Sequence, residues 1–123
     1  DLFATTKLNE VQQDDVFRMW CSRCDQGMDI ANPDNTLLEQ MSEFYHQGEP
    51  YYGYAETIAR SISKGLVKPQ YSYAVYINKT LIYNLTKHNE ENASLLITSK
   101  KLVYGMLDQE LWGPYIAEVR VWQ

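Results

Sequence analysis

Two cysteines with two residues between them are the part of this 123-residue chain whose types and spacing most directly suggest chemistry. They stand in the run Trp20-Cys21-Ser22-Arg23-Cys24. Cysteines at positions i and i+3 of a helix lie within the Cα separation that a disulfide allows, and such a bridge indicates an oxidising compartment. Both cysteines also fall on the apolar stripe of a predicted helix, where a free thiol behaves as a small hydrophobic side chain. The bridge and the buried thiols are open alternatives.

The same five residues, W-C-x-x-C, are similar to the active site of the thioredoxin family. The resemblance implies thiol-disulfide exchange, with Cys21 as a thiolate stabilised by a helix N-terminus. That family places a buried strand before the motif, whereas residues 10–18 here predict a helix, and Pro69 is a loose candidate for its cis-proline. A zinc site needs two further ligands, and His46 and His88 each stand alone. We therefore predict no metal, and we also predict no cofactor. The W-C-x-x-C resemblance makes thiol-disulfide exchange the alternative function.

No other constellation in the sequence predicts catalysis. The acidic pairs at 14–15 and 90–91 are adjacent residues, and adjacent side chains on a helix diverge rather than share a site. His46 ends a predicted helix, where a cation complements the helix dipole. The sequence contains no phosphate-binding loop and no nucleophile elbow. We therefore predict a protein that is not an enzyme.

The tyrosines suggest a binding surface. The chain has ten, and the run Tyr51-Tyr52-Gly53-Tyr54 directly follows Pro50. Consecutive side chains cannot all face a core, so we expect at least one of these rings to be exposed. Tyrosine offers a large contact area at a low cost in rotamer entropy, and interfaces are enriched in it. The predicted binding residues are Tyr51, Tyr52, Tyr54, Phe17, Trp20, Phe44 and Trp112.

Charge is unevenly spread along the chain. The net charge is −5, with a balance of −7 over residues 1–60 and of +2 over residues 61–123. The acidic half favours a basic protein partner, because charge complementarity speeds association. The lysines are scattered rather than gathered on one dense basic face, which argues against nucleic-acid binding. No apolar run approaches the roughly 20 residues that span a bilayer.

Three short motifs bear on localisation. Asn78, Asn84 and Asn92 each begin an N-x-S/T sequence, the acceptor for N-glycosylation in exported eukaryotic proteins. The chain begins with Asp1 rather than with methionine, which is typical of a processed or trimmed protein. Together with the cysteine spacing, these features lead us to expect a secreted or periplasmic (envelope) protein.

The first half of the chain predicts three helices. Apolar residues recur every three or four positions over residues 9–27. Thr36 and Glu39 form a capping box at the start of a second helix that ends near Gly48. A third helix is predicted from Tyr51 or Tyr54 to Lys64.

The second half predicts strands, because residues 74–85 and 95–106 repeat the same order of apolar, polar-Lys and apolar-Tyr residues. Two successive hairpins would produce this repeat, with turns at Asn78-Lys79 and Ser99-Lys100. Gly113-Pro114 predicts a further turn, and residues 115–122 alternate like a half-buried strand. Residues 91–107 also fit a helix, which remains an alternative.

These elements predict an α+β fold in one domain, residues 1–123. Three N-terminal helices (1–68) would pack on an antiparallel β-meander of about five strands (69–123). We predict an exported, non-enzymatic binding module of the inhibitor, immunity, accessory or sensor type. It would bind a protein partner, or a small apolar ligand between helices and sheet. The residues expected to line that ligand pocket are Phe17, Trp20, Met41, Phe44, Ile58, Ile62, Val75 and Ile82.

Overall fold

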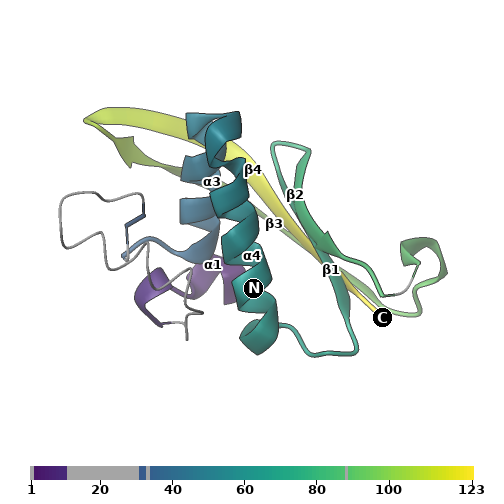
Figure 1. Cartoon of the computed structure of the whole chain (residues 1–123). Coiled ribbons are helices and arrows are strands. Elements are labelled where there is room, and N and C mark those ends of the chain that lie inside the picture. Colours follow the sequence, from purple (N-terminus) through teal and green to yellow (C-terminus); the bar gives the residue numbers. More distant parts are fainter. Residues whose placement is uncertain (1, 11–30, 33, 88) are drawn as a thin grey trace.

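Two helices cover one face of a four-stranded antiparallel sheet, which confirms the α+β class (Figure 1). The computed structural model describes residues 2–10, 31–32, 34–87 and 89–123, apart from the side chains of residues 2, 9 and 61–66. The covering helices are α3 (Leu37–Gln47) and α4 (Tyr52–Leu66). The short helical turns are α1 (Leu2–Thr5), η1 (Leu8–Glu10), η2 (Glu49–Tyr51) and η3 (Glu90–Asn92). The helix predicted over residues 9–27 lies almost entirely outside the described residues.

Helix α3 begins where the capping box predicts. The Thr36 hydroxyl accepts from the Glu39 backbone N–H at 3.2 Å, and the Glu39 carboxylate accepts from the Thr36 N–H at 2.7 Å. Each side chain thereby satisfies a backbone donor that the first helical turn leaves without an acceptor. Met41 and Phe44, one turn apart, are fully buried and turn this helix toward the core.

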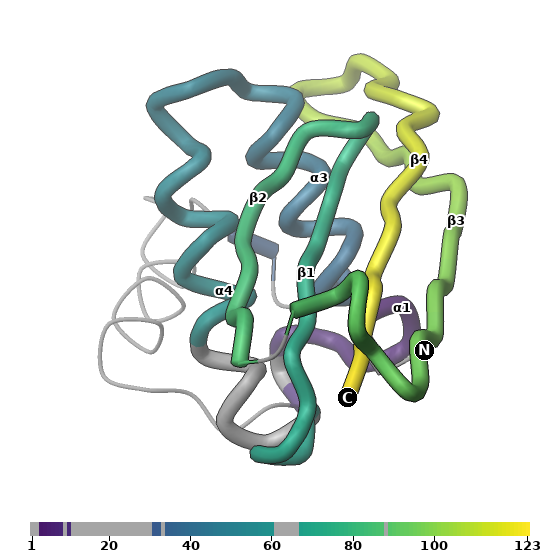
Figure 2. Tube along the Cα trace, turned by 90° about the vertical axis from the view of Figure 1, so that its right-hand side faces the viewer, coloured from purple at the N-terminus to yellow at the C-terminus, as the bar shows by residue number. Residues whose placement is uncertain are grey.

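The sheet has the strand order β2-β1-β4-β3 (Figure 2). The predicted meander of about five strands is therefore wrong in strand number and in order. Strand β4 lies between β1 and β3, so β2 and β3, which follow each other in the chain, form opposite edges. The connection between them carries η3 across the face of the sheet away from the helices (Figure 2). The strands are β1 (Ser72–Ile77), β2 (Thr80–Leu85), β3 (Leu96–Leu107) and β4 (Glu110–Trp122).

The first predicted hairpin turn is confirmed, and the second is wrong. Asn78 and Lys79 both adopt positive φ, 51° and 68°, as a two-residue type I′ turn between β1 and β2 requires. Ser99 and Lys100 instead lie inside the uninterrupted strand β3. The corresponding turn falls at Asp108-Gln109, with φ of 52° and 69°. The alternative helix over residues 91–107 is also wrong.

The sequence predicts a turn at Gly113-Pro114. In the structure these two residues instead form a bulge inside β4. Val103 pairs with Tyr115 and Gly105 with Trp112, so two residues of β4 face the single Tyr104 of β3. Strand β3 therefore keeps a regular alternation, while β4 bends. Beyond the bulge, Ala117 and Val119 point into the core, which confirms the alternation predicted for residues 115–122.

The core fills the space between helices and sheet. The buried Tyr73 of β1 donates its hydroxyl to the Ala59 carbonyl of α4 at 2.7 Å and so ties the two layers together. Four of the residues predicted to line an apolar ligand pocket are fully buried in this core: Met41, Phe44, Ile58 and Val75. Ile82 is partly buried against it, whereas Phe17, Trp20 and the side chain of Ile62 lie outside the described part of the chain.

Candidate functional site

The predicted tyrosine run joins an aromatic cluster where α3, η2 and α4 meet. Phe44 lies 5.5 Å from Tyr54 and 6.2 Å from Tyr51 between ring centroids. Tyr51 and Tyr54 are themselves 5.9 Å apart. Phe44 is fully buried and the two tyrosines are half-buried. These three predicted binding residues therefore pack against one another, with the tyrosine rings only partly open to solvent.

A second aromatic group links the helices to the far end of the β3–β4 hairpin. Tyr45 stacks on Tyr52 at 5.7 Å and meets the edge of Tyr115 at 5.2 Å. His46 Nδ1 lies 2.8 Å from the Tyr115 hydroxyl, and Trp112 stacks on Tyr115 at 6.1 Å. Partial burial raises the pKa of the Tyr115 phenol, so the hydroxyl stays protonated at neutral pH. The group holds the hairpin against the end of α3.

The opposite face of the same hairpin carries large apolar side chains in solvent. We call this surface the hairpin patch, and the exposed fractions of its side chains run from 49% at Ile116 to 76% at Leu111. Register places its members on one face, because Leu102 pairs with Ile116 and Met106 with Leu111. The hairpin patch consists of Leu102, Tyr104, Met106, Leu111 and Ile116.

Strand β3 is also an edge of the sheet, with β4 on one side and no strand of the described sheet on the other. A twelve-residue edge strand presents a row of backbone donors and acceptors to solvent. Lys100 and Lys101 lie in its middle, and both are exposed. Lys100 Nζ lies 4.0 Å from Glu118 Oε1. A shallow cavity of about 270 Å³ separates β3 from the first turn of α3 and is lined on that side by Thr36, Leu38 and Glu39.

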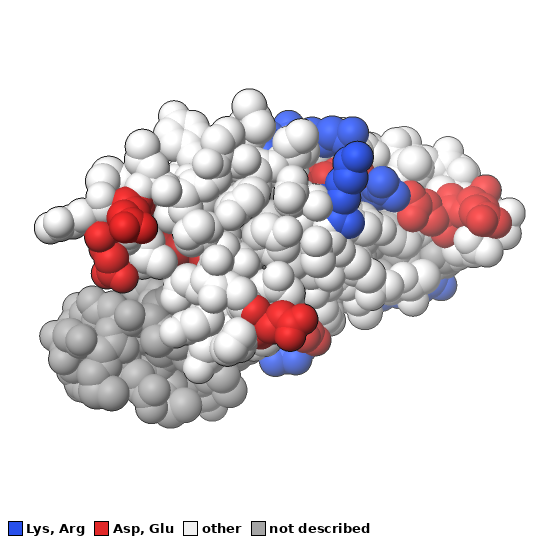
Figure 3. All heavy atoms as spheres, turned by 90° about the horizontal axis from the view of Figure 1, so that it is seen from above, with Lys and Arg blue, Asp and Glu red and all other residues white. Residues whose placement is uncertain are grey.

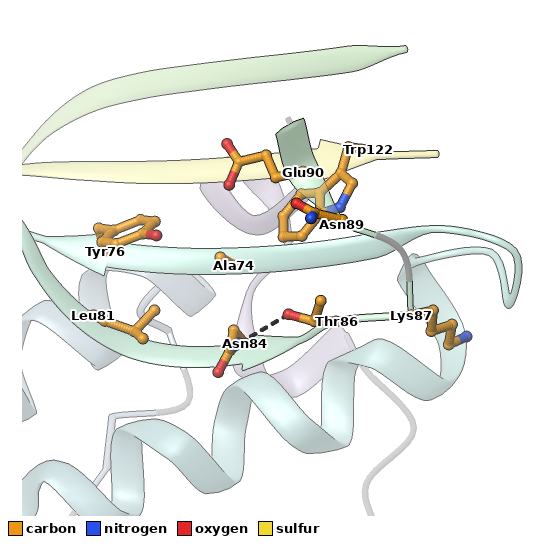
Figure 4. A pocket seen from close by; sticks show the side chains of 9 residues that line it. All are labelled: Ala74, Tyr76, Leu81, Asn84, Thr86, Lys87, Asn89, Glu90 and Trp122. Atoms are coloured by element: carbon orange, nitrogen blue, oxygen red, sulfur yellow. Dashed lines mark hydrogen bonds between the residues drawn. The ribbon is translucent and has the colours of Figure 1, made fainter. Parts of the chain in front are cut away.

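A larger hollow of about 450 Å³ lies near η3 on the face of the sheet away from the helices, which we call the outer face (Figure 4). Ala74 forms its floor, with Tyr76 toward one end and Trp122 beside Asn89 toward the other (Figure 4). Arg120 lies next to it, 4.8 Å above the Tyr76 ring, and pairs with Glu118 and with Glu90. The full lining is Ala74, Tyr76, Leu81, Asn84, Thr86, Lys87, Asn89, Glu90 and Trp122.

A buried polar group on α3 anchors the segment that precedes the helix. The Asn35 side chain donates to Gln40 Oε1 and to Glu43 Oε2, both at 2.9 Å. The Asn32 backbone N–H also donates to Gln40 Oε1, at 2.8 Å. Burial raises the pKa of Glu43, and the nearby carboxylates Asp108 and Glu39 add to the rise against the Asn35 hydrogen bond.

Glu43→Gln is expected to raise the free energy of unfolding at neutral pH. A carboxyl whose pKa is higher when folded than its ordinary 4.5 favours folding below pH 4.5 and loses that contribution as pH rises through the folded pKa. Glutamine is neutral throughout and keeps an acceptor for Asn35. Urea denaturation at several pH values should show the variant's advantage at pH 7 shrinking toward pH 4. Glu56→Gln, at an exposed position of α4, is the control. A Glu43→Gln variant less stable than the parent at pH 7 would contradict this assignment.

The structure brings Tyr51, Tyr52, Tyr54, Phe44 and Trp112 into one region of the molecule. Phe44 and Trp112 are buried in it, the latter with 3% of its surface exposed. The other predicted site residues, Phe17, Trp20, Cys21 and Cys24, lie outside the described residues, and with them the disulfide and the thiol-exchange alternative.

The hairpin patch was not predicted from the sequence. The turn predicted at Ser99-Lys100 would divide strand β3 and so would not place Leu102 and Met106 along one long edge strand opposite Ile116 and Leu111. The available signal was the run of large apolar residues on both sides of the lysine pair, which has no polar alternation of the kind a half-buried strand shows.

The fold and these surfaces define an α+β domain with an exposed apolar hairpin. Among the described residues, no three His, Cys, Asp or Glu side chains gather as they would to hold a metal ion. No helix in the described part of the chain has the length and apolar character needed to cross a membrane. Comparison of the chain with protein-family models, with curated proteins and with solved structures finds no match.

Proposed function

We propose that this domain is a non-enzymatic binding module whose partner is a protein that docks an extended segment along β3. The hairpin patch is the observation that carries the proposal. Its five large apolar side chains are each about half to three-quarters exposed on one continuous face. Contiguous exposed apolar surface of this kind marks interaction sites in soluble proteins, because each exposed side chain forgoes the free energy that burial supplies.

The edge position of β3 indicates how such a partner binds. An extended segment that adds to an exposed edge gains main-chain hydrogen bonds, and its alternate side chains meet one face of the sheet. On the outer face those side chains would contact Leu102, Tyr104 and Met106. On the helix side they would enter the cavity beside Thr36 and Glu39.

Charge favours an acidic residue in the docking segment. Lys100 and Lys101 are neighbours on the edge strand, and the Lys100 side chain is 64% exposed. On the face of the molecule that Figure 3 shows, charged side chains gather in a few places separated by broad uncharged areas. A basic partner, predicted from the acidic N-terminal half of the chain, would have to meet a different surface from this one.

Export to a secreted or envelope location remains part of the proposal. Asn78, Asn84 and Asn92 are all exposed, so each of the three N-x-S/T motifs is accessible. This accessibility supports the expectation that the protein is secreted or located in the envelope.

Selection from a displayed library of extended peptides tests the proposal. We expect the selected peptides to alternate apolar residues and to carry an acidic residue. Leu102→Lys should weaken their binding by tenfold or more, equivalent to about 1.4 kcal/mol. Lys100→Glu should weaken only the peptides that carry an acidic residue.

Leu81→Lys is the matched control, since Leu81 is 49% exposed on the same sheet face but lies on β2, outside the hairpin patch. It should leave peptide binding unchanged. Failure to select any peptide, or equal loss of binding in the Leu81 and Leu102 variants, would contradict a site on β3.

A further inference from the structure

We infer that the hollow on the outer face of the sheet binds a small neutral polyhydroxylated molecule of the carbohydrate class. Its volume of about 450 Å³ falls within the range of small-molecule sites. It exists because Ala74 is small and has larger neighbours: it pairs with Asn84 and Arg120, and Tyr76 follows two residues along β1. The sheet itself therefore provides a fixed floor.

The rim offers both donors and acceptors of hydrogen bonds. The Asn84 side-chain N–H donates to the Thr86 hydroxyl at 2.9 Å, which leaves the Asn84 carbonyl oxygen as an acceptor. The Asn89 side-chain oxygen accepts from the Glu91 N–H at 3.0 Å, which leaves the Asn89 amide as a donor. Sugar hydroxyl groups donate and accept at once, so they match a rim of this mixed character.

The charges near the hollow favour a neutral ligand. The Glu90 carboxylate is paired with Arg120 at 3.3 Å, and Arg120 also donates to Glu118, which raises the pKa of its guanidinium. Among the described residues that line the hollow, Lys87 is the cation, and it donates to the Pro69 carbonyl and points away from the floor (Figure 4). A cationic ligand would compete with Arg120 for Glu90, and an anionic one would face that carboxylate.

Apolar surface completes the site. The half-buried Tyr76 ring stands beside the floor, and Leu81 points toward Ala74 from the neighbouring strand (Figure 4). The C–H faces of a sugar ring pack against such surfaces while its hydroxyl groups reach the polar rim. The hollow shares no residue with the hairpin patch, so each of the two proposed sites can be tested independently of the other.

Titration of the isotope-labelled protein with single neutral monosaccharides, followed by backbone amide NMR shifts, tests the inference. Glucose, galactose, mannose and N-acetylglucosamine are the probes, with glucuronate and arginine as charged comparisons. The protein should be made without N-glycosylation, because Asn84 begins an N-x-T motif. We expect saturable shifts at Ala74, Asn84 and Asn89 with at least one neutral sugar, and weaker effects with both charged molecules.

Two variants make the result specific. Ala74→Leu would fill the hollow, and Asn84→Ala would remove an exposed rim acceptor without touching the core. Each should weaken sugar binding at least severalfold, whereas Asn92→Ala, an exposed asparagine outside the hollow, should leave it unchanged. The inference is overturned if no neutral sugar gives saturable shifts, if arginine or glucuronate binds more tightly than every sugar, or if Asn84→Ala binds like the parent. Asn84→Ala keeps the test valid if Ala74→Leu fails to fold.

Discussion

Phe44→Ala is expected to lower the free energy of unfolding by about 3–5 kcal/mol, the usual cost of truncating a buried phenylalanine. Phe44 has no exposed surface and lies within 6.2 Å of the ring centroids of both Tyr51 and Tyr54. Its removal would leave a cavity where α3, η2 and α4 converge, and these fixed elements could only partly collapse into it. Domains are commonly stable by about 5–15 kcal/mol, so the loss is a large share of the total.

Urea denaturation measures this loss, and Tyr104→Ala provides the control. Tyr104 is 65% exposed, so its truncation should change stability by no more than about 0.5 kcal/mol. The same Tyr104→Ala variant should bind selected peptides more weakly, because its ring belongs to the hairpin patch. A loss below about 1 kcal/mol for Phe44→Ala would show that the aromatic cluster does not support the helices.

Gly105→Ala is expected to destabilise the protein by about 1–3 kcal/mol, the range for overpacking a filled core. A Cβ atom at this position would lie 2.7 Å from Trp112 Cζ2 and 2.9 Å from Cε2. The Trp112 ring has little freedom to yield, because 3% of its surface is exposed and it stacks on both Tyr115 and His46, which also lie against each other. Displacing it would loosen the hairpin from α3.

Gly53→Ala is the matched control for this substitution. Nothing lies within 4 Å of a Cβ built at Gly53, which stands exposed in the first turn of α4. Alanine is the better helix former, so this variant should be stabilised by about 0.5–1 kcal/mol. Thermal melts of both variants give the comparison. Equal or greater stability of Gly105→Ala would mean that Trp112 is not held as the structure places it.

The two faces of the β3–β4 hairpin have different roles. Trp112 and Tyr115 face α3 and hold the hairpin in place, whereas Leu102, Met106 and Leu111 face solvent. A rigid support behind an exposed apolar face reduces the ordering cost of binding. We therefore expect Gly105→Ala to weaken peptide binding as well. The substitution would loosen the packing behind the hairpin patch and would remove no direct contact with the peptide.

Several local features followed from the sequence because neighbouring residues determine them. The capping box needs only Thr36 and Glu39 at the right spacing. Asn78 tolerates positive φ, so the turn between β1 and β2 is local too. The alternation around Ala117 and Val119 identified a strand with one face in the core.

Only the tertiary structure decided which strands pair and which apolar side chains stay in solvent. Ser99-Lys100 and Asp108-Gln109 are both polar pairs between apolar runs, and the one local difference is that Asp108 tolerates positive φ better than Ser99 does. Pairing with β4, whose bulge at residues 113–114 keeps Trp112 opposite Gly105, selects the second pair. Because β4 lies inside the sheet, β3 becomes an edge, and no layer of the described residues covers the apolar side chains of its outer face. The sequence by itself thus determined the N-cap of α3, one turn and the α+β class, while strand order, a long-range property, determined both candidate sites.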